Sequence, residues 1–434
     1  MQRIPLSIGV LSLCSILCFT LSAAEPSWTA FNGVNHDNVS AETGLLKSWG
    51  ENGPKLLWKA DGIGNTEFPG YASVVISEGI IYTAGNVQID GGVSSAVFAL
   101  DEKTGKQLWT FNNGDGWNTK TLFPGERSTP TVDGKYLYAL SSVGQLACLD
   151  AKTGKEIWKR NLREEYIAQL PQWAYAESPL VDDNKVIVWV GGTKASVVAL
   201  DKLTGKTVWE TPTEPLKEGG NEIGNYATMN VFDYQGIRFY INMTQKGMLA
   251  VDGKTGKRLF YHPYEVQHDI NANTPRYIGD GKLLVISGNS KGAELLQLNV
   301  DSGKVSVKSL WQQQKFDCFH GGIIIKDGYV YGSAQRYRKM WICMNLADGS
   351  IAWEDRCVGD IGATSYADGM LYCVAETDGT VALVKATPEK YTEVSRFTLP
   401  EEGVGKFWAH PVICGKKLYL RHAQFLYCYD IAER

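Results

Sequence analysis

Four stretches of the chain alternate apolar and polar residues in the same order, at a spacing of about fifty residues. In each, an apolar run ends at an aspartate, Thr-Gly follows three and four positions later, and an aromatic residue stands eight positions after the aspartate. The copies are ALDEKTGKQLW, CLDAKTGKEIW, ALDKLTGKTVW and AVDGKTGKRLF. Asp and Thr side chains hydrogen-bond nearby backbone, and Gly accepts a positive φ, so each copy predicts two antiparallel strands joined by a tight turn.

Weaker copies extend the series towards the C-terminus. Asn299 and Asn345 take the place of the aspartate in two of them, 383–391 is a degenerate copy, and Asp430 begins a copy that lacks its last strand. The segment around Trp58 has the pattern of that missing strand but no turn motif before it. Repeats of this length suit four-stranded antiparallel units. The sequence therefore predicts an all-β protein, an eight-bladed β-propeller whose N-terminal strand pairs with the C-terminal strands.

The aromatic residue at the end of each copy is expected to pack between blades, where it can bury a large apolar surface. These structural docking residues are Trp58, Trp109, Trp158, Trp209, Phe260 and Trp353. A lysine follows the turn glycine in five copies, at the start of the outermost strand, where a charge discourages pairing between exposed sheet edges. The lysines are Lys106, Lys155, Lys206, Lys257 and Lys304.

The domain organisation follows from the repeats and from the first residues. Residues 1–24 contain Arg3, an apolar run and small residues at 22–24, which is typical of a secretory signal peptide. Residues 25–53 form an N-terminal extension expected to pack on the propeller, and residues 54–434 form the propeller itself. We therefore predict an exported protein, periplasmic or extracellular, with no later membrane span.

Charge and cysteine content limit which binding partners and disulfides the chain can have. The chain has 43 basic and 47 acidic residues and no basic run, so nucleic acid is a poor partner. Seven cysteines follow the leader without CxxC spacing, and only Cys318 and Cys357 lie in loop-like sequence where a disulfide is a candidate. We expect a monomer that binds a small molecule or a cell-envelope protein.

A propeller places the residues that precede each innermost strand at one mouth of its central channel, which predicts a funnel. One such residue comes from each blade: Tyr71, Arg127, Glu177, Tyr226, Asn273, His320, Thr364 and His410. The loops that lead to them add Trp173, His268, Asp269 and Trp408. This ring concentrates the ionisable and aromatic residues that a binding or catalytic site needs.

The pattern Ala-x-Asp-x-x-Thr-Gly-x-x-x-Trp resembles the tryptophan-docking repeat of pyrroloquinoline quinone (PQQ) type propellers, the quinoprotein alcohol dehydrogenase-like superfamily. The resemblance covers residues 54–434 and implies the same fold. It also implies a candidate PQQ site in which Arg127 bonds the quinone oxygens and Trp173 or Trp408 stacks on the ring. The Ca²⁺ of that site would take oxygen ligands from Glu177, Asp269 and Asn273.

Two departures from those enzymes favour a binding role. The chain has no adjacent cysteine pair and no CxxCH haem motif. We therefore predict a binding module or scaffold that acts through its funnel, with a PQQ- and Ca-dependent alcohol or sugar dehydrogenase as the alternative. Carbohydrate binding would suit the aromatic funnel, whereas no Gly-x-Ser-x-Gly motif supports a hydrolase.

Overall fold

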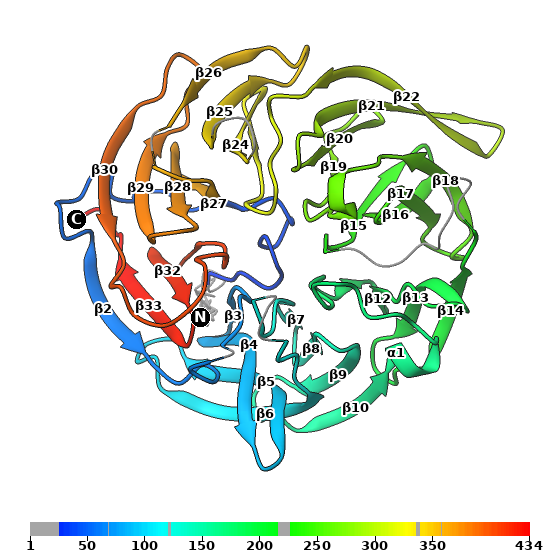
Figure 1. Cartoon of the computed structure of the whole chain (residues 1–434), viewed down its shortest axis with the longest axis horizontal. Helices are drawn as coiled ribbons and strands as arrows, with labels where there is room; N and C mark the ends of the chain where they lie inside the picture. Colours follow the sequence, from blue (N-terminus) through cyan, green and yellow to red (C-terminus); the bar gives the residue numbers. More distant parts are fainter. Residues whose placement is uncertain (1–25, 68, 120–122, 216–225, 336–338, 357) are drawn as a thin grey trace, which may run out of the picture.

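The repeats build a ring of eight sheets around a central axis (Figure 1). The computed structural model describes residues 26–67, 69–119, 123–215, 226–335, 339–356 and 358–434. The predicted signal peptide and Cys357 lie outside these residues. The prediction of an all-β, eight-bladed propeller is confirmed.

Each blade is an antiparallel sheet of four strands, the first nearest the axis and the fourth at the rim (Figure 1). The first four blades are β3 to β6 (Val75–Ser77, Ile80–Ile89, Gly92–Asp101, Gln107–Asp115), β7 to β10 (Thr131–Asp133, Tyr136–Leu140, Gln145–Asp150, Glu156–Asn161), β11 to β14 (Leu180–Asp182, Lys185–Trp189, Ala195–Asp201, Thr207–Pro212) and β15 to β18 (Asn230–Tyr234, Ile237–Met243, Gly247–Asp252, Arg258–Pro263). The next three are β19 to β22 (Arg276–Tyr277, Lys282–Ser287, Gly292–Asp301, Lys304–Gln313), β23 to β26 (Ile324–Lys326, Tyr329–Ala334, Met340–Asn345, Ile351–Asp355) and β27 to β30 (Gly362–Ala367, Met370–Ala375, Thr380–Lys385, Glu393–Thr398).

The eighth blade closes the ring by pairing the two ends of the chain. It consists of β31 (Val412–Cys414), β32 (Lys417–His422) and β33 (Phe425–Asp430), with β2 (Lys55–Ala60) as its outer strand. Lys55 pairs with Asp430, and Ala60 pairs with Leu426. The predicted closure is therefore confirmed, and no blade is left without its fourth strand.

The repeated turn is held by its aspartate. In the first copy, Asp101 Oδ1 accepts hydrogen bonds from the backbone N–H and the hydroxyl of Thr104, at 2.8 and 2.6 Å. The N–H of Gly105 donates to the carbonyl of Asp101 at 2.8 Å, and Gly105 adopts a φ of +69°. A residue with a Cβ would be strained at that φ, so the repeat requires glycine there.

The tryptophan of one blade docks on the turn of the next. Trp109 Nε1 donates to the carbonyl of Ala151 at 3.2 Å, and its ring lies where a Cβ on Gly154 would come within 2.6 Å. Trp58, Trp158, Trp209 and Trp353 make the equivalent bond to the next unit, at 2.8–3.3 Å. A β-bulge at the residue before each of these rings turns the ring towards its neighbour.

The fifth blade differs from the predicted register. Asn299 does not begin its turn, because β21 continues to Asp301 and pairs with Lys304 across a two-residue turn. The docking residue of this blade is Trp311, which the sequence pattern missed, and its Nε1 donates to the carbonyl of Leu346 at 3.2 Å. The sequence allows either the repeated Asp-x-x-Thr-Gly-like turn or the two-residue turn Ser302-Gly303, and the chain forms the two-residue turn.

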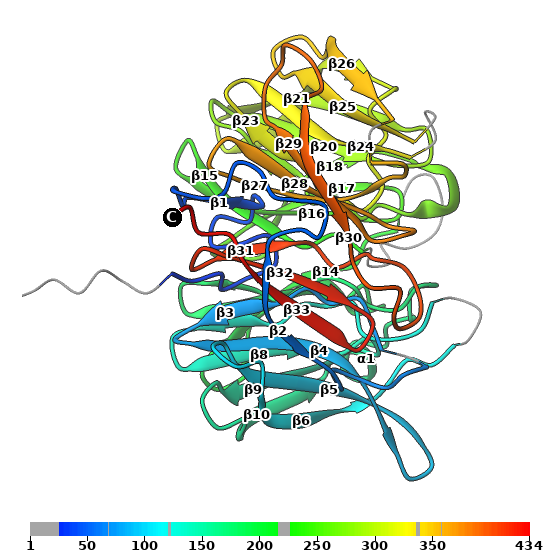
Figure 2. The same ribbon diagram turned by 90° about the vertical axis from the view of Figure 1, so that its left-hand side faces the viewer.

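The N-terminal segment crosses the ring on one side, as the dark blue coil in Figures 1 and 2 shows. Trp28 forms a bridge with Ile76, and β1 (Val39–Ser40) pairs in parallel with β27. Between these anchors, the segment brings Phe31 to the axis, where its ring lies 4.9 Å from that of His410. The extension therefore supplies part of the wall of the central channel.

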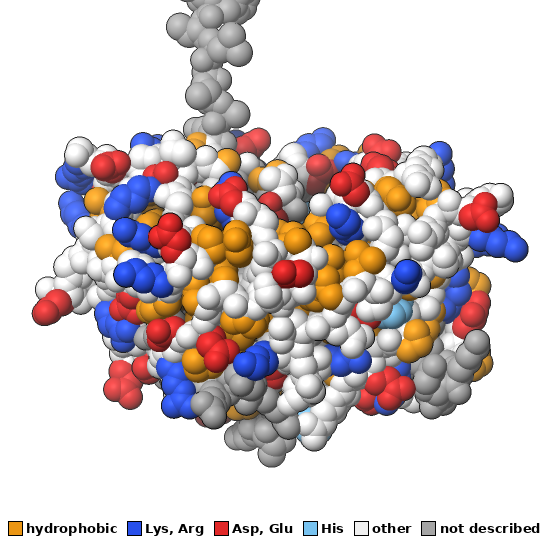
Figure 3. Space-filling model, turned by 90° about the horizontal axis from the view of Figure 1, so that it is seen from above, with side chains coloured by type: hydrophobic (Ala, Val, Ile, Leu, Met, Phe, Trp, Pro, Cys, Tyr) orange, Lys and Arg blue, Asp and Glu red, His pale blue; other side chains and the backbone are white. Residues whose placement is uncertain are grey.

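The rim of the ring carries charged side chains among apolar ones (Figure 3). The lysines that follow the turn glycines, Lys106, Lys155, Lys206, Lys257 and Lys304, are all exposed. The helical segments among the described residues are α1 (Leu162–Glu165) and η1 (Gln267–Asp269). Neither they nor any other helix of this part of the chain is long and apolar enough to span a membrane.

Candidate functional site

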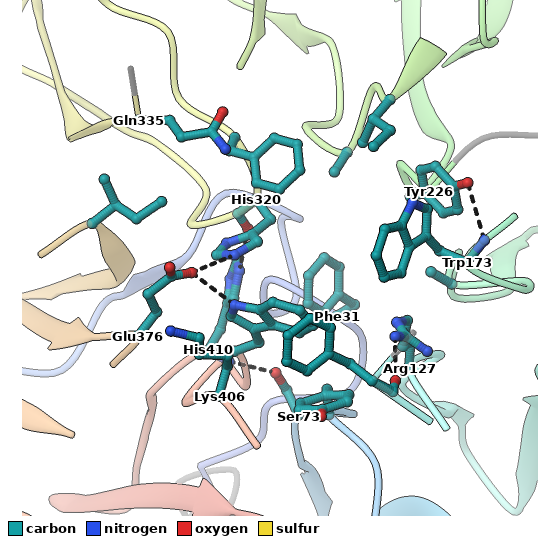
Figure 4. Close-up of a pocket in the computed structure, with 18 residues that line it drawn as sticks. Phe31, Ser73, Arg127, Trp173, Tyr226, His320, Gln335, Glu376, Lys406 and His410 are labelled. Carbon is teal, nitrogen blue, oxygen red and sulfur yellow. Dashed lines mark hydrogen bonds and ion pairs between the residues drawn. The ribbon is translucent and has the colours of Figure 1, made fainter. Parts of the chain in front are cut away.

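A cavity of about 390 Å³ lies at the centre of the ring (Figure 4). Its size is within the range of small-molecule sites. Seven aromatic side chains line it, and they come from blades around the ring and from the N-terminal segment. They are Phe31, Tyr71, Phe123, Trp173, Tyr226, Phe319 and Trp408.

Most of the residues predicted for the funnel line this cavity. They are Tyr71, Arg127, Trp173, Tyr226, His320, Trp408 and His410. Phe123 lies between the two tryptophans, with its ring centroid 6.4 Å from Trp173 and 5.1 Å from Trp408. The ring of His320 meets that of Trp408 edge-on at 5.2 Å.

Glu177 and Asn273 do not line the cavity, because each lies one position after the residue that does. The wall contains their neighbours Ala176 and Ala272 instead. Successive side chains of an extended chain point to opposite sides, so when the alanine faces the cavity the next side chain faces the blades. Thr364 is also buried away from the cavity, which corrects its place in the predicted funnel.

The three candidate calcium ligands are each engaged by protein groups. The carboxylate of Glu177 accepts hydrogen bonds from the N–H of Trp189 and from Asn242 Nδ2, at 2.5 and 3.2 Å. Asp269 forms an ion pair with Lys246 at 2.8 Å, and the Asn273 amide donates to the carbonyls of Cys318 and Phe319.

Burial raises the pKa of Glu177 well above its ordinary value, which favours the neutral carboxyl. A neutral, hydrogen-bonded carboxyl is a poor ligand for a hard divalent cation. The set therefore does not fit a calcium site. Among the described residues, no group of three or more His, Cys, Asp and Glu side chains is placed to hold a metal ion.

Cys318 and Cys357 are the candidate disulfide pair, and Cys357 lies outside the described residues. Cys318 is buried, makes no disulfide to another described cysteine, and donates its thiol to the carbonyl of Gly322 at 3.3 Å. A free thiol at Cys318 corrects the candidate disulfide. The other described cysteines are also buried and form no disulfide with one another.

Sequence reasoning missed several polar residues of the cavity. Gln335 and Glu376 follow directly after β24 and β28, the second strands of their blades. The second strand runs antiparallel to the first, so its end lies at the same mouth as the start of the first strand. That signal was present in the sequence. Lys406 and Phe31 reach the cavity from long loops, for which the repeat carries no signal.

Glu376 organises one wall of the cavity. Its Oε2 accepts hydrogen bonds from His320 Nε2 at 3.0 Å and from Trp408 Nε1 at 2.8 Å (Figure 4). Burial works to raise the pKa of this carboxyl, but the hydrogen bond and charge of His320, the bond from Trp408 and the charge of Lys406 outweigh it and lower the pKa. Glu376 is therefore ionised at neutral pH.

Arg127 supplies a cation on another wall. Its Nη1 and Nη2 donate to the carbonyls of Gly125 and Phe123, at 3.2 and 2.5 Å. The guanidinium lies 4.6 Å over the ring of Trp117 and 5.3 Å from the ring of Tyr71. Burial lowers the pKa of Arg127 to about 10, so the side chain stays charged at neutral pH.

Next to Arg127, Glu126 is fully buried and makes stability depend on pH. Its Oε2 accepts hydrogen bonds from the N–H and the hydroxyl of Ser142, at 2.8 and 3.1 Å. Burial nevertheless raises the pKa of Glu126 to about 7. Between the unfolded pKa of about 4.3 and this value, only the folded protein holds the proton, so the free energy of unfolding falls as pH rises.

We expect Glu126→Gln to remove about 3 kcal/mol of that decline between pH 4 and pH 8, since a Gln side chain cannot ionise. Urea denaturation at a series of pH values measures it. Burial also raises the pKa of Glu177. The free energy of unfolding should therefore still fall somewhat with rising pH in the Glu126→Gln variant, as it does in the wild type. An unchanged slope in the variant would show that Glu126 does not titrate in this range.

The ring and its central cavity define this protein as an eight-bladed β-propeller with an axial pocket. The PQQ_2 family model, described as outer membrane protein assembly factor BamB, matches residues 93–354. The chain belongs to this family of PQQ-like β-propellers.

Individual relatives match smaller parts. Quinoprotein ethanol dehydrogenase of Pseudomonas aeruginosa is 31% identical over 36% of this chain and 20% of its own length. The assembly factor BamB of Yersinia pestis is 24% identical over 58% of this chain and 62% of its own. In the crystal structure of quinohemoprotein alcohol dehydrogenase from Comamonas testosteroni, the TM-score is 0.61 at 14% identity, over 95% of this chain and 81% of that one.

The sequence matches to the first curated relatives are partial, since they span between 20% and 44% of those proteins' lengths. The structural likeness, at 14% identity, shows the shared fold alone. These relatives carry two different names, a dehydrogenase and an assembly factor, so the fold does not select between the two functions.

Proposed function

We propose that this protein is a binding module whose central cavity holds a small aromatic ligand. The observation that carries this proposal is the cavity itself, about 390 Å³ in volume and lined by seven aromatic side chains. Aromatic faces bind planar apolar ligands, while a few polar groups fix the orientation. Arg127, Lys406 and the hydrogen-bonded pair of His320 and Glu376 are those polar groups.

The leader-like residues 1–24 support export to the periplasm or beyond, and we include that location in the proposal. A role as a scaffold for cell-envelope proteins is compatible with the cavity, and the family description and the BamB relatives support it. A pull-down from the cell envelope tests the scaffold role: partners retained by the wild type and lost on substituting cavity-mouth residues would support it.

The ligand-binding role is tested by filling the cavity. Ala272 lines the cavity with a small side chain, so Ala272→Phe is expected to occupy ligand space without removing any polar group. In ligand-observed NMR with indole and nitrobenzene, we expect saturation transfer in the wild type and at least a tenfold weaker affinity in the variant. Ala176→Phe, on a different blade, is the second variant, and unchanged melting temperatures confirm that both fold. Equal binding to all three proteins, or binding to none, would overturn the proposal.

A PQQ-dependent dehydrogenase is the second candidate, and the quinoprotein relatives are the observation in its favour. The hydrogen-bonded carboxyl of Glu177, whose pKa burial raises, and the ion pair of Asp269 with Lys246 argue against it. Reconstitution with PQQ and Ca²⁺ tests it directly. We expect neither bound quinone absorbance nor alcohol-dependent dye reduction, and the appearance of both would make the dehydrogenase the better proposal.

A further inference from the structure

Three consecutive blades meet at one polar wall of the cavity. His320 comes from the loop before β23, Glu376 directly follows β28, and Trp408 comes from the loop before β31. A single oxygen, Oε2 of Glu376, accepts hydrogen bonds from both His320 Nε2 and Trp408 Nε1, at 3.0 and 2.8 Å. The carboxylate therefore fixes the imidazole ring from behind while the ring faces the cavity (Figure 4).

This arrangement fixes the position of the imidazole proton. An ionised carboxylate only accepts hydrogen bonds, so Nε2 of His320 must carry the hydrogen. In the neutral ring the other nitrogen, Nδ1, is then an acceptor. Among the described residues, Nδ1 has no hydrogen-bond partner, and it is not among the buried unsatisfied atoms, so it is accessible to solvent on a residue that lines the cavity.

The charges around this nitrogen favour an anion. Lys406 lines the same cavity, donates to Thr377 Oγ1 at 3.2 Å, and lies close enough to lower the pKa of Glu376. Arg127 adds a second positive charge, and Glu376 is the one carboxylate among the described lining residues. The His410 ring touches the carbonyl of His320 through Nε2, and burial lowers its pKa to about 4, so it adds no charge.

The aromatic rings of the cavity wall favour a ligand of planar shape. Phe123 packs against Trp173 and Trp408, and all three aromatic rings line the cavity. A ligand that matches both features has a planar aromatic ring and a weakly acidic hydroxyl. The hydroxyl can donate to Nδ1, and Lys406, close to Glu376, favours the oxygen anion that remains.

Resting on the ligand-binding role above, we propose that the cavity binds phenols, with the hydroxyl proton passing to Nδ1 of His320 and Glu376 positioning that residue. In this step the ligand O–H bond breaks and an Nδ1–H bond forms. The imidazolium is held by Glu376, and the phenolate oxygen faces Lys406. No electrons are exchanged, so the step needs no oxidant.

The probe that tests this is 4-nitrophenol, whose phenolate absorbs visible light, with 4-nitroanisole as the matched ligand that lacks the proton. We expect the wild type to bind 4-nitrophenol at least tenfold more tightly than 4-nitroanisole, and to raise the ionisation constant of the bound phenol about tenfold. Glu376→Gln and His320→Phe should abolish that rise. Glu402→Gln, which neutralises a carboxylate outside the cavity, should retain it.

A measurement without ligand tests whether Glu376 sets the tautomer of His320 or only packs against it. In ¹⁵N NMR of the free wild type, we expect His320 to show the Nε2–H tautomer, and Glu376→Gln to lose that preference. Equal affinity for the two probes, or an ionisation rise that survives in His320→Phe, would overturn the inference and leave the ligand-binding role standing. Binding of neither probe would overturn both.

Discussion

Replacing Trp209 by alanine is expected to lower the free energy of unfolding by about 3–5 kcal/mol. The ring is 8% exposed, and Nε1 donates to the carbonyl of Gly253 at 3.3 Å. It also stacks on Tyr240, with ring centroids 6.0 Å apart, and covers Gly256. The substitution removes this contact between the third and fourth blades and leaves a carbonyl without its partner, and urea denaturation measures the loss.

The residue before Trp209 is the matched control. Val208 occupies the bulge of the same strand and is 49% exposed. Val208→Ala is therefore expected to change stability by no more than about 0.5 kcal/mol, as surface substitutions usually do. If both variants lost the same amount, the effect would belong to the strand and not to the docked ring.

The fold could be predicted because each blade carries its own copy of the signal. The turn aspartate, the turn glycine and the docking ring recur in order, and Trp58 stood without a turn of its own, which indicated the closure. The predicted strand register was wrong only where the turn motif was ambiguous. In the fifth blade, Gly303 supports a shorter turn than the motif does, and the docking role passes to Trp311.

The cavity was predicted less completely, for two physical reasons. A single-residue error reverses the direction of a side chain in extended backbone, which is why Ala176 and Ala272 line the cavity where Glu177 and Asn273 were expected. Long loops carry no periodic pattern, so nothing in the repeat placed Lys406 beside the axis.

Buried charges that hold the ring together are a further feature that the pattern did not reveal. Arg421 in β32 is 4% exposed and lies where the eighth blade meets the first. Its Nη1 donates to the carbonyls of Ala72 and Ala84 and to Thr83 Oγ1, at 2.5–2.8 Å. Burial lowers the pKa of Arg421 to about 9, and Glu126 offsets part of this shift when its own carboxyl, whose pKa is about 7, is ionised.

At pH 8, where Glu126 is ionised, we expect Arg421→Met to lower the free energy of unfolding by about 3–5 kcal/mol, because it leaves several buried acceptors and the charge of Glu126 without their cation. The comparison in urea is with Arg434→Met. Arg434 pairs with Asp430 in the same blade, but its side chain is 76% exposed, so its loss should cost no more than about 1 kcal/mol. Similar losses in the two variants would contradict a special role for the buried arginine.

Arg421→Lys separates charge from hydrogen-bond geometry. Lysine keeps the positive charge near Glu126, but its single ammonium cannot reproduce the planar fork that reaches acceptors on two segments. If the fork matters most, the lysine variant should lose nearly as much stability as Arg421→Met. If it instead retained most of the stability, charge balance with Glu126 would hold this junction, and the carbonyls of Ala72 and Ala84 would be satisfied without the fork.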